Sequence, residues 1–420
     1  MIYRILQFIM KQSLLVYYKD IKVEGKIDLD KNESYIIAAT HPNSFLDAII
    51  LATILKQPLY FLARSDVFKK SWADFILRKL NLIPIYRLQE GLENLTKNDK
   101  TFSECYAILE NQGSILIFAE GISLIDKKVR PLKKGLTRIG FGAEQKNQFK
   151  LKTHVVPIGI NYQKAAQFGN NILISIQDKI ALKPYQEAYQ ESANQCYINF
   201  NQTLLNSLKQ ASIETEDEEV FDSIAEQVEN KHYKLAYLKN ISERLAYLKS
   251  NRIEQWEMLN NAIHTIKKLQ HKYGFGLAKS SYSLVDLILV IILSPLACLG
   301  YCFNRMPFAV ANYISNKKVK LIEFYDSVKL VLGTLLWILW AALLSILFGL
   351  LLHPLFFLFP FALVISGKAY LLFKNKTATI LSTFRYKRMK KSEAAQHSDS
   401  DYKKFKQAKK TLDELIFDAI

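Results

Sequence analysis

The sequence has few cysteines, and none of them is spaced with a histidine as metal ligands are. In 420 residues there are only four cysteines, namely Cys105, Cys196, Cys298 and Cys302. Nothing in their number or spacing indicates the disulfide framework of a secreted protein. We therefore expect a chain that works in a reducing compartment and holds no metal ion.

Acidic residues are also scarce relative to basic ones. Asp and Glu number 39 against 56 Lys and Arg, which gives a formal net charge of +17. Such a surplus suits an anionic partner, either nucleic acid or a membrane surface. Much of it lies beside hydrophobic segments, so membrane phospholipid explains it better, and we expect no nucleic-acid partner.

Charge is missing altogether from one long stretch of the C-terminal half. Residues 330–352 contain no charged side chain. As a helix with a rise of about 1.5 Å per residue, this stretch is long enough to cross a hydrocarbon core of roughly 30 Å. A second apolar run over 354–373 predicts a transmembrane hairpin within a membrane region of residues 273–375. A third segment, 287–303, is short for a span and carries Pro295 at its middle.

The flanking charges bear on whether the 287–303 segment crosses. The 304–326 loop and the basic polar tail of residues 376–420 both contain several Lys and Arg residues. The positive-inside rule favours the cytoplasmic side for both, and only two full spans satisfy it. We predict that 287–303 is re-entrant or interfacial. The protein is then a multi-pass protein of the cell (inner) membrane.

The N-terminal 19 residues lack the small-residue cleavage site of a signal peptide. Apolar residues recur there at helical spacing, with Arg4 and Lys11 between them. This pattern predicts an interfacial amphipathic helix over residues 1–19. A buried core helix is the alternative.

Alternating strand and helix signals begin after the N-terminal helix. The candidate strands are "IKVEG", "SYIIAAT", "LYFLAR", "LIPIYR", "SILIFAE" and "HVVPIGINY". Short apolar runs separated by helices predict an α/β domain with a mixed, mainly buried sheet and flanking helices, over residues 20–200. A charged helical region over 201–272 and C-terminal transmembrane helices should follow.

The stretch "THPNSFLD" places His41 six residues ahead of Asp47, between an apolar strand and an apolar helix. A histidine with a carboxylate at such a junction is typical of a general base and its orienting group. Ser44 and Asp47 also fit an S-x-x-D capping box that opens a helix, and a histidine before proline suits a turn. The residues alone leave both hypotheses open.

Four blocks in order resemble the motifs of the glycerolipid acyltransferase superfamily, which includes glycerol-3-phosphate and 1-acylglycerol-3-phosphate acyltransferases. "HPNSFLD" resembles the H-x-S-x-x-D motif, and "LIPIYR", ending in Arg87, the second motif. "IFAEGIS" is similar to the third, usually F-P-E-G-T-R, and "VVPIGI" to the fourth. The resemblance covers roughly residues 20–165.

Two departures from the family pattern stand out. Five residues separate His41 from Asp47 where four are usual, and the extra one falls in the loop before Ser44, where it is cheaply absorbed. In the third motif Ser123 replaces the arginine, which puts phosphate recognition by that loop in doubt. Basic residues just beyond, Lys133 among them, are candidate substitutes, and a basic stripe facing a membrane is an equal alternative.

The resemblance implies a reaction and a role for each motif residue. His41 takes the proton of a glycerol hydroxyl as it attacks an acyl thioester, of acyl-CoA or acyl carrier protein, and Asp47 orients the imidazole. Arg87, with Arg64 second, binds the phosphate of a glycerophosphate-type acceptor. Glu120 bonds an acceptor hydroxyl or orients its loop. The remaining expected substrate-binding residues are Gly121 and Lys133.

The implied enzyme belongs to phospholipid biosynthesis, needs no metal or other cofactor, and has its catalytic domain on the cytoplasmic face. An acylated amino acid is an alternative acceptor. An inactive membrane-tethered scaffold with the same fold is the other hypothesis, and the altered third motif supports it.

Overall fold

A computed structural model describes residues 2–27, 29–55, 57–86, 96–228, 232–276, 282–392 and 401–420. The chain divides into two compact units. The first contains residues 1–214 together with 321–327, and the second contains 215–320 and 328–420. The first unit holds every strand in the described part of the chain.

An eight-stranded mixed sheet forms the centre of the first unit, in the order β1-β7-β6-β2-β5-β3-β4 with β8 paired to β6. Most neighbours are parallel, whereas β6 pairs antiparallel with β7 and β8. The predicted α/β fold with a mixed sheet is confirmed. The strands are β1 (Asp20–Glu24), β2 (Ser34–Ala39), β3 (Leu59–Arg64), β4 (Leu82–Ile85), β5 (Ser114–Phe118), β6 (Thr153–Tyr162), β7 (Asn171–Ile176) and β8 (Ile180–Ala181).

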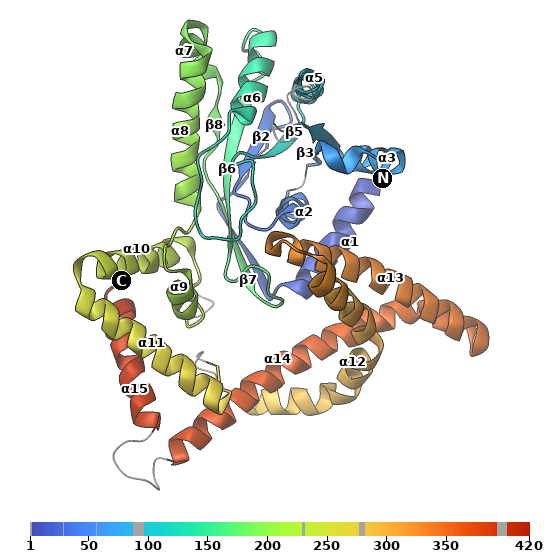
Figure 1. Ribbon diagram of the computed structural model, residues 1–420. Coiled ribbons are helices and arrows are strands. Elements are labelled where there is room, and N and C mark those ends of the chain that lie inside the picture. The colour runs from blue at the N-terminus through green and yellow to red at the C-terminus, as the bar shows by residue number, and fades with distance from the viewer. Residues whose placement is uncertain are drawn as a thin grey trace. The chain divides into compact units, whose positions relative to one another are not determined.

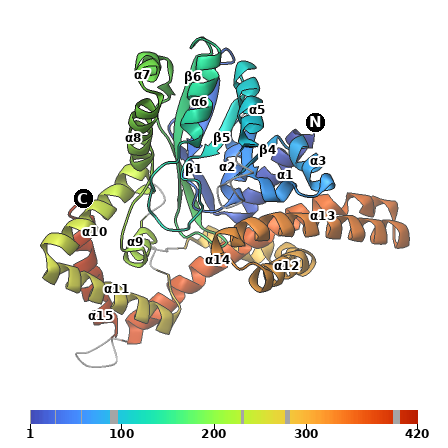
Figure 2. The same cartoon turned by 45° about the horizontal axis from the view of Figure 1, so that its top comes forward.

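Helices cover both faces of this sheet. The crossover through α2 (Phe45–Ile54) runs from β2 to β3 in one direction along the sheet. Those through α5 (Asn98–Glu110) and α6 (Gly135–Lys146) run back the other way. Right-handed crossovers in opposite directions place their helices on opposite faces. Figures 1 and 2 show this layering around β2, whose six residues are all buried.

The remaining helices of the first unit pack around this frame. α1 contacts α2, and α8 contacts β6 and α6. Short helical turns connect β3 to β4 and lead into α8. These elements are α1 (Ile2–Tyr17), η1 (Ser65–Phe68), α3 (Ser71–Lys79), η3 (Lys183–Tyr185), α7 (Gln186–Glu191) and α8 (Ala193–Ala211).

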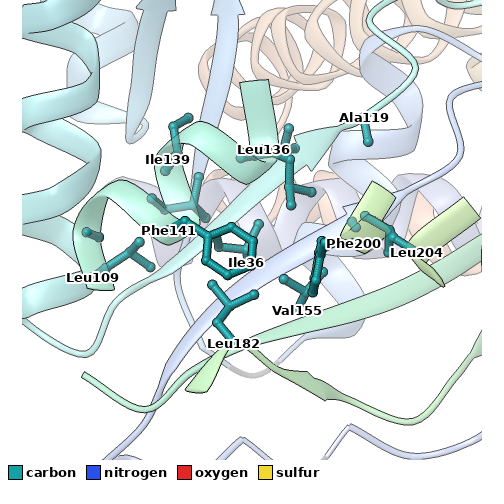
Figure 3. Close-up of a cluster of buried hydrophobic side chains, with 14 of the residues drawn as sticks. Ile36, Leu109, Ala119, Leu136, Ile139, Phe141, Val155, Leu182, Phe200 and Leu204 are labelled. Carbon is teal, nitrogen blue, oxygen red and sulfur yellow. The ribbon is translucent and has the colours of Figure 1, made fainter. Parts of the chain in front are cut away.

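The main hydrophobic core lies between the sheet and the helices α5, α6 and α8. Figure 3 shows Phe141 from α6 and Phe200 from α8 pointing toward Ile36 of β2. The two phenyl rings are 5.4 Å apart in an edge-to-face arrangement. Leu136 and Ile139 complete this face of α6 at helical spacing and are fully buried. The core therefore fixes the strands whose ends carry the motif residues.

The second unit is helical. Its described helices are α9 (Glu218–Ala225), α10 (Leu235–Asn251), α11 (Ile253–Tyr273), α12 (Leu284–Lys318), α13 (Tyr325–Leu351), η6 (Pro354–Leu358), α14 (Phe359–Ser392) and α15 (Asp401–Leu412), followed by a π-helical turn (Asp413–Phe417). The first turn of α13, and η5 (Ile322–Phe324) before it, belong to the first unit. Three helical stretches, 284–318, 322–351 and 354–390, are long and apolar enough to cross a membrane.

Contacts along α12 show that its first half runs antiparallel to α14. Near its start, Asp286 forms an ion pair with Lys376 at 2.5 Å. Farther along, Asn304 donates a hydrogen bond to the carbonyl of Leu363, at 3.2 Å. As the residue numbers rise along the first half of α12, the numbers of its partners in α14 fall. The first half of α12 therefore runs toward the turn at residues 352–358, which precedes α14.

The second half of α12 runs back along α13. The Trp337 indole donates to the Asn304 side chain at 2.7 Å, and Phe308 lies against Gly333. Because α13 leads into the turn at 352–358, this half of α12 runs away from that turn. Pro307 lies inside the helix, where proline is a common cause of bending, and Figure 1 shows α12 bent.

Candidate active site

The turn from Thr40 to Asp47 leaves the sheet at the carboxyl end of β2 and enters α2. The Thr40 N–H donates to the carbonyl of Ile158 at 3.1 Å, and the Thr40 hydroxyl accepts the N–H of Ile160 at 2.9 Å. Both bonds tie the start of the turn to β6. We call residues 40–47 the catalytic turn because they carry the pair expected from the sequence to be catalytic. This turn begins from a fixed point at the edge where parallel strands present their ends.

The structure brings His41 and Asp47 together. Their Nδ1 and Oδ2 atoms are 3.0 Å apart, with the histidine side chain 16% exposed and the aspartate fully buried. Asp47 also accepts the N–H of Asn43 at 2.8 Å and the hydroxyl of Tyr162 at 2.6 Å. With Nδ1–H directed at the carboxylate, the Nε2 atom of His41 is the nitrogen that can exchange a proton with a substrate.

Asp47 does not cap the helix, and the capping-box interpretation is wrong. Ser44 precedes α2 with φ 50° and ψ −141°, and its side chain forms no capping hydrogen bond. The Asp47 carboxylate is directed back at His41 instead. Few non-glycine residues adopt this backbone conformation, because it raises the free energy of the folded chain by about 1–3 kcal/mol. Other contacts must therefore hold Ser44 in place.

Two residues of the β5 end support the catalytic turn. The ring of Phe118 stacks on the His41 imidazole with centroids 3.7 Å apart and planes 10° from parallel. The Ser123 hydroxyl accepts the N–H of Ser44 at 2.8 Å. Ser123 stands where the resembling family usually has arginine. In this chain that position bonds the catalytic turn and supplies no positive charge.

Glu120 is buried at the end of β5. Its Oε2 accepts the N–H of Arg130 at 3.2 Å. Burial raises the pKa of Glu120 to about 7, while the backbone N–H groups of Arg130 and His41 and the Arg130 guanidinium hold it down. The carboxyl group thus joins the catalytic turn to the 120–134 loop, which favours the loop-orienting role over direct contact with an acceptor.

Gly121 and Lys133 lie side by side in this loop. Gly121 has φ +73°, a conformation that L side chains rarely adopt, and an added Cβ would come within 3.1 Å of the Lys133 side chain. The Lys133 N–H donates to the carbonyl of Ala119 at 2.8 Å, while its side chain is exposed. The structure therefore places a lysine beside the third motif.

Of the two candidate phosphate-binding arginines, the structure describes Arg64 but not Arg87. Arg64, at the carboxyl end of β3, forms a 2.5 Å ion pair with Asp66, and both side chains are partly exposed. Arg87 lies outside the described residues. The last described residue before it, Tyr86, is held by Asn98 through two hydrogen bonds of 2.9 Å. β4 is parallel to β3 and ends at the same edge of the sheet.

Sequence reasoning missed several partners of the catalytic turn. Tyr162 belongs to the quoted fourth-motif strand, and its burial beside Asp47 raises its pKa well above the usual value, so it remains a hydrogen-bond donor. Asp326 and Ser327 contact Asn43 from more than 280 positions away, and no local pattern marks them. Among the described residues, no group of three or more His, Cys, Asp or Glu could hold a metal ion.

Comparison with known proteins finds a match for the part of the chain that contains this site. Residues 20–161 match a family model described as acyltransferase. The chain therefore contains an acyltransferase domain that holds the catalytic turn, β5 and β6.

A distant similarity to one enzyme of this kind is also found. A 1-acyl-sn-glycerol-3-phosphate acyltransferase of Bacillus subtilis (strain 168) is 27% identical over 121 residues, which cover 28% of this chain and 55% of that protein. The chain thus matches about half the length of this curated relative. The crystal structure of the 1-acyl-sn-glycerophosphate acyltransferase PlsC from Thermotoga maritima aligns with a TM-score of 0.36 and 19% identity, over 49% of this chain and 79% of that one.

Proposed function

We propose that the chain is a membrane-bound O-acyltransferase. It moves a fatty acyl group from an acyl thioester to the hydroxyl of glycerol-3-phosphate or of a lysophospholipid such as 1-acylglycerol-3-phosphate. The observation that carries the proposal is the His41–Asp47 pair, joined at 3.0 Å at the carboxyl edge of the sheet, with a fully buried aspartate. A hydroxyl is a poor nucleophile at neutral pH, and such a pair supplies the general base that it needs.

The reaction follows from this arrangement. The Nε2 atom of His41 takes the proton of the acceptor hydroxyl while the oxygen attacks the thioester carbonyl. The tetrahedral intermediate then collapses, the C–S bond breaks, and the imidazolium returns its proton to the leaving thiolate. Asp47 holds the imidazole in the Nδ1–H tautomer and stabilises the imidazolium. The products are the ester and the free thiol.

The acceptor and donor are tested directly by supplying candidates to the purified full-length chain. Acyl-CoA and acyl carrier protein thioesters are each paired with glycerol-3-phosphate, 1-acylglycerol-3-phosphate and an acylated amino acid. We expect ester formation with a phosphate-bearing acceptor. Activity confined to the amino-acid derivative would reject the glycerophosphate assignment while keeping the transferase chemistry.

Arg87 is proposed as the phosphate ligand, because it matches the arginine of the second motif and because β4, which precedes it in the sequence, ends at the same edge of the sheet as β3. Replacing it with alanine removes a charge-assisted contact of about 1.5–3 kcal/mol. We expect Arg87→Ala to raise the acceptor KM roughly ten- to hundredfold and to leave the donor KM unchanged. Steady-state kinetics with each substrate varied in turn measures both constants.

Arg78 offers a matched control. It is ion-paired with Asp74 and Glu104 on the outer helix α3, so Arg78→Ala should leave both KM values near those of the unaltered protein. Equal increases of the acceptor and donor KM in Arg87→Ala would indicate a structural arginine instead.

The proposed location is the cytoplasmic face of the cell (inner) membrane, where acyl thioesters are made. Two helices of the first unit support contact with a lipid surface. α1 exposes Ile2, Ile5 and Phe8, while α3 exposes Trp72 and Phe75. Exposed apolar and aromatic side chains on helices that also carry lysine and arginine suit the interface of a bilayer.

We further propose that α13 and α14 cross the membrane and that α12 enters and leaves on one side. Both halves of α12 run antiparallel to a neighbour, first toward the turn at 352–358 and then away from it. This course supports the re-entrant role expected for 287–303. The short length of 287–303 is by itself no argument against a full crossing, because the segment is part of the 35-residue helix α12.

Three cysteine variants in an otherwise cysteine-free chain test this topology. We expect Asn316→Cys and Ala419→Cys to be protected from an impermeant thiol reagent in intact cells and to be labelled after lysis. His353→Cys, at the turn, should be labelled in intact cells. If α12 crosses completely, the pattern reverses, with positions 316 and 419 labelled and position 353 protected.

A further inference from the structure

A short segment from far along the chain packs against the catalytic turn. Residues 321–327 belong to the first compact unit although they follow α12 in the sequence. They include the first turn of α13, which begins at Tyr325. Asp326 and Ser327 are both fully buried. We call these two residues the α13 clamp.

Ser327 bonds the catalytic turn on both sides of Ser44. Its hydroxyl donates to the carbonyl of Asn43 at 3.0 Å. The same oxygen accepts the N–H of Leu46 at 3.1 Å. Since Ser44 has a positive φ of 50°, which non-glycine residues rarely adopt, these two bonds hold the part of the turn that is least stable by itself.

Asp326 binds the side chain of Asn43. One of its carboxylate oxygens accepts the Asn43 side-chain amide at 3.2 Å, and the other accepts the Tyr17 hydroxyl at 2.5 Å. Burial, with Asp326 beside it, raises the pKa of Tyr17, so the phenol stays protonated and donates. A buried carboxylate with two donors is a fixed anchor, since each charge-assisted bond is costly to break.

Asn43 transmits this anchoring to the reacting groups. Its backbone N–H donates to the same Asp47 oxygen that lies 3.0 Å from the His41 ring. Asn43 also lies between His41 and Ser44, where this chain has one residue more than the usual motif. The longer turn thus includes a side chain, that of Asn43, that reaches Asp326.

We infer that Asp326 and Ser327 are positioning residues for the acyl-transfer site, which set the geometry of the His41–Asp47 pair through Asn43. The inference rests on the proposed function. Neither residue touches a reacting atom. Loosening the turn should therefore reduce the rate of the chemical step and spare the binding of both substrates.

Three variants of the full-length protein test the clamp. Ser327→Ala removes both bonds to the turn, and kcat should fall roughly 10- to 100-fold with both KM values nearly unchanged, because small misplacements of catalytic groups cost about this much. Ser327→Thr keeps the hydroxyl and should recover most of the lost rate. Ser345→Ala is the matched control, since it deletes a hydroxyl on the same helix that bonds the backbone carbonyls of Phe356 and Phe357.

Hydrogen exchange gives a readout that does not depend on activity. The amides of Asn43 and Leu46 should exchange faster in Ser327→Ala than in Ser345→Ala, while those of β5 should not change. If the unaltered protein transfers no acyl group, the proposed function fails and exchange still decides whether the clamp holds the turn. Unchanged exchange in Ser327→Ala would overturn the clamp.

The remaining outcomes are also decisive. Faster exchange with an unchanged kcat would overturn the positioning role. If Ser327→Ala does not fold, Asp326→Asn replaces it, because an amide can accept from only one of Tyr17 and Asn43 and so weakens the anchor with little change in volume. A normal kcat and normal exchange in Asp326→Asn would then reject the inference.

Discussion

Replacement of His41 by alanine is expected to lower kcat for acyl transfer by at least about 100-fold, because general-base catalysis typically contributes 10²–10⁴-fold. Folding should survive the change. Asp47 keeps the N–H of Asn43 and the hydroxyl of Tyr162 as donors, so the alanine leaves no buried carboxylate without partners. Kinetics and thermal unfolding of the same preparation measure both effects.

His154 provides the control for this substitution. Its side chain is 14% exposed and lies 3.4 Å from Glu33, so it resembles His41 in burial and in having a carboxylate neighbour. It lies at the amino end of β6, away from the catalytic edge. His154→Ala should keep a normal kcat. If His41→Ala keeps more than about a tenth of the rate, the general-base role is wrong.

Asp47→Asn is expected to reduce kcat by roughly 10³-fold, since it removes the charge that stabilises the imidazolium and fixes the ring tautomer. The amide has nearly the same volume, but its NH₂ group replaces an oxygen that accepts a hydrogen bond, from either the Asn43 N–H or the Tyr162 hydroxyl, and the remaining bonds lose the strength that the charge gave them. Unfolding free energy should therefore fall by about 1–3 kcal/mol. Measuring kcat well below the unfolding temperature separates the two effects.

Tyr162→Phe is the companion variant. It removes one hydrogen bond from Asp47 and leaves the carboxylate and the His41 contact in place. Its kcat should fall far less than that of Asp47→Asn. If both variants lose stability equally and Asp47→Asn retains normal kcat, Asp47 supports the fold and has no part in the proton transfer.

The strands were predictable where the sequence has short apolar runs between helices. The runs over β2, β5 and β6 are buried on both faces, and such runs are typical of central strands. β7 and β8 were not predicted. β7 has a similar apolar run but joins the sheet antiparallel to β6, so the strand-helix alternation that revealed the others stops before it.

The site was predictable only in part. The motifs placed His41 and Glu120 at the ends of apolar strands, and the carboxyl ends of parallel strands meet at one edge of the sheet. Spacing could not give the direction of Asp47, because the S-x-x-D pattern fits a helix cap equally well. The positive φ of Ser44 decides the question. The bonds that hold this conformation come from Ser123 and Ser327, which are distant in sequence.

The central claim is that His41 drives the transfer of an acyl group from a thioester to a hydroxyl. The most direct measurement supplies the purified full-length chain, in lipid, with a long-chain acyl thioester and 1-acylglycerol-3-phosphate or glycerol-3-phosphate, and follows free thiol and new ester together. The account predicts one thiol released for each ester formed, with both signals lost in His41→Ala and kept in His154→Ala. Thiol release without ester, or equal ester formation by His41→Ala, would contradict it.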